Sequence, residues 1–182
     1  MPDIKPGVVL IATPKLRDPN FERSVVLILT FDQKGCVGLI LNRPSPVTCE
    51  YIARKLNLTW SAPQQQLLIG GPVESQGIWL LHTPNSSMDH QPITESISAS
   101  RSRDALELLC SIQEQALRLY FGYANWGPGQ LEREISRGDW WVGSCSHELV
   151  FEHSYEEVWS EALRLMGVDP LCLIYDHLEL SH

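Results

Sequence analysis

Three apolar runs within the first 42 residues set the start of the fold. Gly7–Thr13 is apolar and rich in β-branched residues, which predicts a first strand. Ser24–Phe31 and Cys36–Asn42 are two further runs, separated by the polar turn Asp32–Gly35. Both runs are continuously apolar rather than alternating, which indicates burial on both faces. We therefore predict a hairpin in the middle of a sheet, covered on two sides.

Beyond the hairpin, the spacing of apolar residues alternates between helical and strand-like periods. Capping residues and glycines help to place the ends of the helices. Helices are predicted at 47–58, 103–112, 128–138 and 154–166. Strands are predicted at 66–69, 78–83, 117–123 and 140–145. Strands that come first as a hairpin and then mix with separate helices are typical of an α+β fold. Without a linker or an internal repeat, the 182 residues are expected to form one domain, 1–182.

The chain is acidic, with a net charge of −8 from 14 basic and 22 acidic residues. The first 60 residues hold eight basic and five acidic residues (+3), and the remainder holds six and seventeen (−11). Direct nucleic-acid binding is therefore disfavoured, because phosphate contacts need Lys and Arg. Two interpretations are open for Arg17, Arg23 and Arg43: a local anion site, or pairing with acidic residues of the second half. Pairing is favoured, since it is the usual fate of partly buried arginine.

Cysteine usage and the N-terminus point to a reduced, cytoplasmic protein. The five cysteines form no C-x-x-C and are odd in number, which is neither a disulfide framework nor a zinc motif. No charged segment followed by an apolar segment opens the chain, and the longest apolar runs are far below the ~20 residues that span a bilayer. No association with a membrane is therefore expected.

The sequence contains none of the common motifs for cofactor binding or catalysis. The chain has no G-x-G-x-x-G, no phosphate loop, no H-E-x-x-H and no G-x-S-x-G. Cys145, His147 and His153 are three potential metal donors in one short segment, but ordinary polar and core roles are favoured because zinc ligands usually come in spaced pairs. We therefore predict no cofactor, no metal and no catalytic residue.

Four clusters of glycine, proline, polar and aromatic residues lie at the ends of predicted strands. The first is the loop 14–23, with Pro14, Arg17, Phe21 and Arg23. It is either a binding loop or a rigid connection with Phe21 in the core, and the connection is slightly favoured because prolines chiefly fix the direction of the chain.

The second cluster is Asn42-Arg43-Pro44, which ends a buried strand. It either faces a cleft or forms a turn held by the Asn42 side chain, and neither interpretation is preferred. The third cluster holds Gly70 and Gly71 before a proline. Backbone amides there could hold an anion, but a tight turn between strands is the favoured interpretation.

The fourth cluster, 121–134, joins a strand to a helix. Tyr123 and Trp126 either line a pocket or fill the core, and core packing is the commoner role of such aromatics. Gln130 and Glu134 share one face of the predicted helix. Carboxylates in the first turn of a helix favour its dipole, so Glu132 and Glu134 are not by spacing a catalytic acid pair.

These clusters together resemble the YqgE/AlgH family of small bacterial proteins, which is also found in plants. The resemblance runs from Gly7 to about Gly167. It rests on the segments Leu10-Ile-Ala-Thr-Pro14, Phe21-Glu-Arg-Ser-Val25, Gly38-Leu-Ile-Leu-Asn-Arg-Pro44, Gly70-Gly-Pro-Val73 and Gly122-Tyr-Ala-Asn-Trp-Gly-Pro-Gly-Gln-Leu-Glu132. Asn125 stands where the family usually has glycine, and Asn tolerates a left-handed backbone.

The resemblance implies an α+β fold in which a branched mixed β-sheet curls into an incomplete barrel flanked by helices. It implies little about function, because the family is largely uncharacterised and has no accepted set of catalytic residues. One branch carries the label of a transcriptional regulator, from a link to alginate production.

We expect a non-enzymatic, cytosolic regulatory or adaptor protein that binds a protein or a small-molecule ligand, since the motif-rich turns hold no nucleophile, metal set or phosphate loop. The predicted binding face joins Pro14, Arg17, Phe21, Arg23, Asn42, Arg43, Pro44, Gly70, Gly71, Tyr123, Asn125, Trp126, Gln130 and Glu134. It requires Arg43 and Trp126 to lie on the same side of the molecule. Alternatives are a transcriptional regulator that contacts DNA through the basic N-terminal third, or an enzyme that clamps an anionic metabolite with arginines and moves a proton with Glu132 or Glu134.

Overall fold

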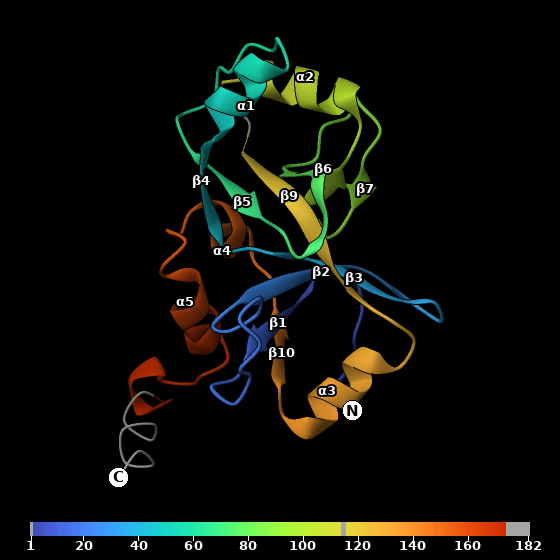
Figure 1. Ribbon diagram of the computed structural model, residues 1–182, viewed down its shortest axis with the longest axis vertical. Helices are drawn as coiled ribbons and strands as arrows, with labels where there is room; N and C mark the ends of the chain where they lie inside the picture. Colours follow the sequence, from blue (N-terminus) through green and yellow to red (C-terminus); the bar gives the residue numbers. More distant parts are fainter. Residues whose placement is uncertain (1, 114–115, 174–182) are drawn as a thin grey trace.

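The computed structural model describes residues 2–113 and 116–173, which are organised by a ten-stranded sheet (Figure 1). The order along the sheet is β10 (Trp140–Ser144), β1 (Val8–Ala12), β2 (Val25–Asp32), β3 (Gly35–Ile40), β9 (Leu117–Trp126), β6 (Val73–His82), β8 (Ser98–Ser100) and β7 (Gln91–Pro92). The sheet branches at β9, because β5 (Gln66–Ile69) pairs with β9 in parallel and with β4 (Pro44–Thr48) antiparallel. The predicted α+β class, with a branched mixed sheet curled into an incomplete barrel, is confirmed.

The predicted hairpin is present as β2 and β3, joined by a turn in which the Asp32 side chain accepts from the Lys34 N–H at 2.7 Å. Its two faces contribute to different cores, as the continuous apolar runs predict. Leu27 and Leu29 lie in the core under α5 (Val158–Leu165), whereas Val26 and Ile28 lie in a second core that includes Trp126. The hairpin is therefore covered on both sides.

Several boundaries differ from the sequence prediction: β6 begins at Val73, five residues earlier than expected, β9 extends to Trp126, and α5 begins at Val158, four residues later than expected. The helix expected from residue 47 begins later, as α1 (Cys49–Lys55), and β4 occupies the residues before it. Thr48 caps this helix by accepting from the Tyr51 N–H at 3.2 Å, while the Cys49 N–H is held by Gln65 O. The short elements β7, β8 and α4 (His147–Phe151) were not predicted, because two to five residues carry too little periodicity to be recognised.

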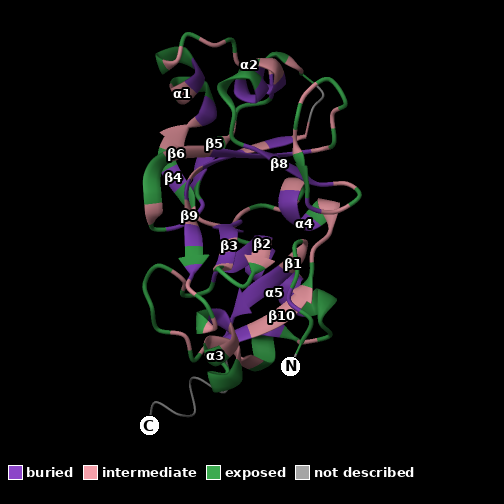
Figure 2. Cartoon of the chain, turned by 90° about the vertical axis from the view of Figure 1, so that its right-hand side faces the viewer, coloured by how far each residue is buried: buried purple, intermediate pink, exposed green. Residues whose placement is uncertain are grey.

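The helices lie around the rim and on one face of the sheet. Figure 1 shows α1 and α2 (Arg103–Ser111) at one end of the molecule and α3 (Gln130–Arg137) at the other. The helices α4 and α5 cover the core face of β1 and β2, where the Trp159 indole N–H donates to Ala12 O at 3.0 Å. In the view coloured by burial, the strands are mostly buried and the exposed residues gather in loops and on outer helix faces (Figure 2). None of the described helices is both long and apolar enough to cross a membrane.

The branch point depends on a close approach of two glycine turns. The Gly70 N–H donates to Phe121 O and the Gly70 carbonyl accepts from the Ile40 N–H, both at 2.8 Å, so this residue joins β9 to β3. A Cβ atom at Gly70 would lie 2.4 Å from Gly122 O, and one at Gly122, which has φ +68°, would lie 2.5 Å from Gly71 O. This crossing has no room for a side chain at either glycine. The close approach allows β5 and β9 to pair in their observed register.

Candidate functional site

The residues of the predicted face divide into two regions. In the first, Glu134 Oε2 accepts hydrogen bonds from the indole N–H groups of Trp126 and Trp140, each at 2.9 Å. Glu134 Oε1 accepts from the Gln130 amide at 2.9 Å, and Gln130 Oε1 accepts from the Gly127 N–H at 3.1 Å. Both indoles are nearly fully buried, at 2% and 3% exposed. This part of the motif is therefore satisfied within the fold and locks α3 onto the sheet.

The second region joins the loop 14–23 to the segment after β3. The Asn42 side chain binds another segment rather than the backbone of its own turn: it accepts from the Val25 N–H at 3.0 Å and donates to Arg23 O at 2.9 Å. The Arg43 guanidinium donates to Pro19 O at 2.8 Å and to Glu22 O at 3.3 Å. The segment Asn42-Arg43-Pro44 and this loop thus form one surface.

The favoured pairing of the early arginines with acidic residues is not seen among the described residues. Within 2–113 and 116–173, Arg17, Arg23 and Arg43 have no carboxylate within ion-pair distance. Arg43 is held by carbonyl groups, and the Arg23 guanidinium lies 5.0 Å from the centre of the Trp159 ring. Arg17 is exposed. Within the described part of the chain, Arg23 therefore lies beside an aromatic ring and Arg43 beside carbonyl groups, and neither is paired with a carboxylate.

The two regions lie toward opposite ends of β3. Trp126 is paired with Cys36 at the start of that strand, whereas Arg43 follows its other end. Phe21 is the link between them, because its ring centre lies 5.9 Å from that of Trp126 and its loop carries the carbonyl groups that hold Arg43. Phe21 is half-buried against the second core, as the rigid-connection interpretation expects.

The remaining predicted residues have separate places. Tyr123 packs edge-on against Trp79, with 6.1 Å between ring centres, and Asn125 is exposed on β9. Gly70 and Gly71 are buried in the strand crossing. Pro14 is half-buried and Pro44 is exposed. Among these, only Pro44 contributes to the groove beside Arg43.

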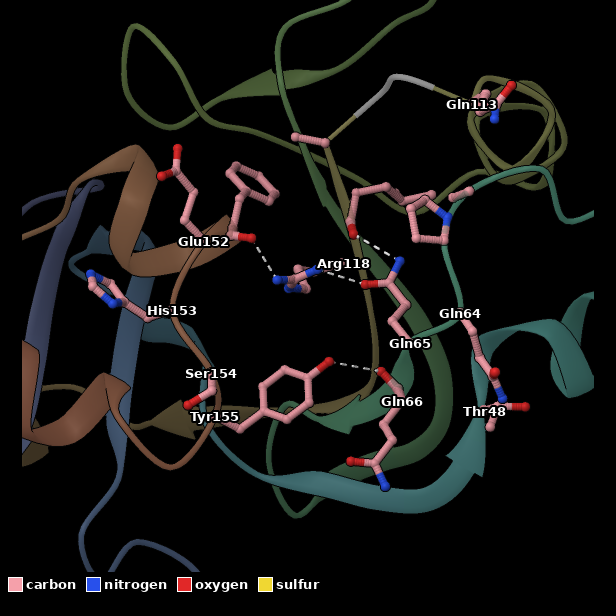
Figure 3. Close-up of a pocket in the computed structure, with 15 residues that line it drawn as sticks. Thr48, Gln64, Gln65, Gln66, Gln113, Arg118, Glu152, His153, Ser154 and Tyr155 are labelled. Atoms are coloured by element: carbon pink, nitrogen blue, oxygen red, sulfur yellow. Dashed lines mark hydrogen bonds between the residues drawn. The ribbon is translucent and has the colours of Figure 1, made fainter.

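A cleft of about 860 Å³ lies elsewhere, around Arg118 of β9 (Figure 3). One wall consists of the glutamine-rich segment Gln64 to Gln66, which leads into β5. The other wall consists of the residues from Phe151 to Tyr155. Arg118 donates to Gln65 Oε1 at 2.7 Å and to Phe151 O at 2.6 Å, so it bridges the two walls. Gln65 is itself fixed, because its amide donates to Leu117 O at 3.0 Å.

The electrostatics of this cleft favour an anion. Arg118 is half-buried, and no carboxylate of the described residues lies within 4.0 Å of its guanidinium. Two of its N–H groups are used by Gln65 and Phe151, and a guanidinium has five N–H groups in all. The Tyr155 ring lies 5.9 Å from the guanidinium carbon, and burial raises the pKa of the Tyr155 hydroxyl, which therefore stays protonated at neutral pH. The Tyr155 hydroxyl donates to Gln66 O at 3.5 Å, so the remaining N–H groups of Arg118 and the glutamine side-chain amides are the donors available to an anionic group.

The Arg118 cleft and the Arg43 surface are neighbours that share one lining residue. A groove of about 460 Å³ runs past Arg23, Asn42 and Arg43, and Tyr155 lines both hollows. The sequence analysis missed Arg118, because an arginine inside an apolar strand resembles one exposed on its edge. Its position in the sequence could have indicated a special role, because Arg118 is the one charged residue between Leu117 and Ala124.

The potential metal donors do not assemble as considered. Cys145, His147 and His153 form no common set in the described part of the chain; the three groups that converge are His147, Glu148 and Glu152, whose ligand atoms lie within 4.8 Å of one another. Both carboxylates are exposed, and Glu152 pairs with His147 Nδ1 at 3.3 Å. Burial raises the pKa of the Cys145 thiol to about 12, so the thiol is protonated at neutral pH in the protein as it stands.

Comparison with known proteins decides the family. A family model described as AlgH-like matches residues 9–171. The chain belongs to the AlgH-like family. A UPF0301 protein of Myxococcus xanthus is 39% identical over 96% of this chain and 97% of its own, and one of Caulobacter vibrioides is 34% identical over 96% and 91%.

Solved structures agree. The solution structure of AlgH from Pseudomonas aeruginosa is similar to this AlgH-like protein with a TM-score of 0.74 and 27% identity, covering 96% of this chain and 97% of that one. A crystal structure of a Corynebacterium diphtheriae protein gives a TM-score of 0.73 at 26% identity, with coverage of 90% and 87%. These names state no activity, so membership establishes the fold and leaves the function of the family uncharacterised.

Proposed function

We propose that this AlgH-like protein is a cytoplasmic regulatory or adaptor protein that binds an anionic group, of a small molecule or of a protein, in the Arg118 cleft. The observation that carries the proposal is the half-buried guanidinium of Arg118, which crosses a cleft of about 860 Å³ with no carboxylate of the described residues within 4.0 Å. A partly desolvated cation without a counter-charge attracts anions more strongly than an exposed one.

The shape of the surface supports a partner larger than a single ion. The groove beside Arg23 and Arg43 shares Tyr155 with the cleft and adds two arginines without carboxylate partners in the described part of the chain. An acidic peptide segment or an elongated anionic metabolite could contact both. We assign binding rather than catalysis to this surface, since the Ser154 hydroxyl in the cleft wall donates to the Glu157 carboxylate at 2.7 Å, in the turn before α5.

A thermal-shift screen of anionic metabolites and acidic peptides tests the proposal. A ligand at 100 times its Kd stabilises the folded state by about 2.7 kcal/mol, which raises the Tm by several degrees. We expect Arg118→Gln to abolish the shift, Arg43→Gln to weaken it when the ligand is long, and Arg133→Gln on exposed α3 to leave it unchanged. A ligand whose shift survives Arg118→Gln, with the variant folded, would contradict this site.

A further inference from the structure

Ser100 and His82 form a hydrogen-bonded pair that the Arg118 cleft does not include. Ser100 Oγ lies 3.0 Å from His82 Nε2. The two residues are on neighbouring strands, since β6 pairs with β8 so that Leu80 faces Ser100 and His82 faces Ser98. They are therefore diagonal neighbours on one face of the sheet, within reach of each other.

The hydrogen bonds determine the tautomer of His82. Its Nδ1 lies 2.7 Å from Thr83 O, and a carbonyl oxygen can only accept, so Nδ1 carries the proton. In the neutral ring Nε2 is then an acceptor, and the Ser100 hydroxyl donates to it. A second acceptor, Asp89 O, is more distant from Ser100 Oγ at 3.5 Å. Burial of the ring lowers the pKa of His82, and the nearby His90 lowers it further, so the imidazole is neutral at pH 7.

Ser100 lies at the wall of a second cleft, whereas its partner His82 is fully buried and does not line the cleft. Ser100 lines a hollow of about 700 Å³, together with the apolar side chains of Met88 and Leu108 and the first turn of α2. The cleft shares no lining residue with the Arg118 cleft. Asp104 of that first turn lines the cleft, and no preceding helical carbonyl can accept from its backbone N–H group. Donors of this kind polarise a carbonyl and stabilise an oxyanion.

From this geometry we propose that Ser100 is a nucleophile activated by His82, and that the second cleft hydrolyses small, uncharged carboxylic esters. The components match those of a serine hydrolase: a hydroxyl bonded to a neutral imidazole, and an imidazole oriented by an acceptor on its other nitrogen. Here the orienting acceptor is a backbone carbonyl in place of a carboxylate. The apolar side chains of the wall suit an aliphatic acyl or alcohol group. Of the charged side chains that line the cleft, Arg101 is paired with Glu74 at 3.0 Å, whereas the carboxylates of Asp89 and Asp104 disfavour an anionic group.

Each step balances with water as the only co-reactant. Ser100 Oγ forms a bond to the carbonyl carbon of the ester while its proton passes to His82 Nε2. The bond from that carbon to the alcohol oxygen then breaks, and Nε2 returns the proton to the leaving alcohol. Water attacks the acyl-serine ester, gives a proton to Nε2, and releases the carboxylic acid as Ser100 Oγ recovers its proton.

A fluorophosphonate probe tests the nucleophile directly, because it forms a stable bond to an activated serine and releases fluoride. The full-length folded protein is treated with the probe, and the modified residue is located by fragmentation of the peptide that ends at Arg101. We expect labelling at Ser100, no labelling of Ser100→Ala, and a rate at least about 100-fold lower for His82→Asn, which keeps a donor toward Thr83 O and removes the base. Hydrolysis of p-nitrophenyl acetate should fall in parallel.

Ser87→Ala is the matched control, since Ser87 lines the same cleft and is exposed. It should label like the unmodified protein. Circular dichroism and thermal melts separate loss of reactivity from loss of folding, and Ser100→Ala removes a single oxygen atom. An unlabelled wild-type protein, or labelling that persists in Ser100→Ala, would overturn the proposal. Arg118→Gln should label normally, so failure here is independent of failure at the anion site.

Discussion

Glu134 is the residue on which the glycine- and tryptophan-rich motif depends. One of its carboxylate oxygens accepts from both Trp126 and Trp140, and the other accepts from Gln130. Hydrogen bonds to a carboxylate are stronger than neutral ones, and a buried indole N–H without an acceptor is costly. The motif therefore contributes to stability through a polar network that crosses from α3 to the ends of β9 and β10.

Replacement of Glu134 by alanine should destabilise the protein by about 2–4 kcal/mol, since two buried indole N–H groups lose their acceptor. Glu134→Gln keeps one acceptor oxygen without the charge, and should cost about 1 kcal/mol. Urea unfolding followed by tryptophan fluorescence measures both. Glu132→Ala, on the same helix and without an indole partner, should cost less than about 1 kcal/mol. Equal losses in Glu132→Ala and Glu134→Ala would remove the network as the cause.

Sequence reasoning reached part of this network. It placed Gln130 and Glu134 on one helix face and favoured core packing for Trp126. It could not connect them to Trp140, because that contact depends on how β10 lies beside α3, and local spacing does not determine it. Ser100 and His82 were missed for a similar reason: the pair is formed by the register between β6 and β8, and β8 is too short to be recognised from three residues.

At the level of elements, β9 is the strand at which the sheet branches, because it pairs with β3, β5 and β6. The crossing of the β5–β6 turn over β9 requires glycine on both sides. A Cβ atom at Gly122 would lie 2.5 Å from Gly71 O and 2.8 Å from Val73 O. The steric demand is set by the backbone of another element, so it cannot be relieved by a change of side-chain rotamer.

Gly122→Ala and Gly138→Ala separate this steric demand from the intrinsic cost of a left-handed backbone. Both glycines have positive φ, +68° and +81°, and nothing lies within 4 Å of a Cβ atom at Gly138. The left-handed conformation should lower the free energy of unfolding of each alanine variant by about 1–2 kcal/mol. Gly122→Ala should lower it by at least about 2 kcal/mol more because of overpacking. Urea denaturation gives both values. Similar losses in the two variants would show that the crossing tolerates a methyl group.

The elements that the sequence predicted best are those with long uniform patterns. The hairpin β2–β3 was expected with burial on both faces, and two different cores cover it. The start of α1 was placed too early, because Val47 fits a helical period equally well and the pairing of β4 with β5 is a long-range contact. Tertiary pairing thus decided a segment in which local periodicity was ambiguous.

Across the whole molecule, the candidate anion site is assembled from distant parts of the chain. Gln65, Arg118, Phe151 and Tyr155 meet only because β9 lies beside β5 and because α4 and α5 fold back over the sheet. No local motif contains two of the walls. The sequence analysis therefore located the turns that shape the scaffold and the groove beside Arg43, but it did not locate the Arg118 cleft.

Net charge also acts at this scale, and it bears on the label of transcriptional regulator. The chain carries −8 overall and −11 beyond residue 60. Non-specific DNA binding at physiological salt depends on several Lys or Arg contacts to phosphate, with Kd values of about 1–100 μM. A few arginines in a cleft do not provide such a surface, because the acidic remainder repels the duplex.

We therefore expect no retardation of a random DNA duplex in gel-shift assays at physiological salt with about 10 μM protein. Lowering the salt should produce at most weak binding, which Arg43→Gln and Arg17→Gln together would remove, since these residues lie in the basic N-terminal third. The matched control is Arg133→Gln with Arg137→Gln, which removes the same charge from the acidic part of the chain. Retardation that persists at physiological salt, with an affinity that falls steeply as salt rises, would show a phosphate-binding surface and return a direct DNA contact to consideration.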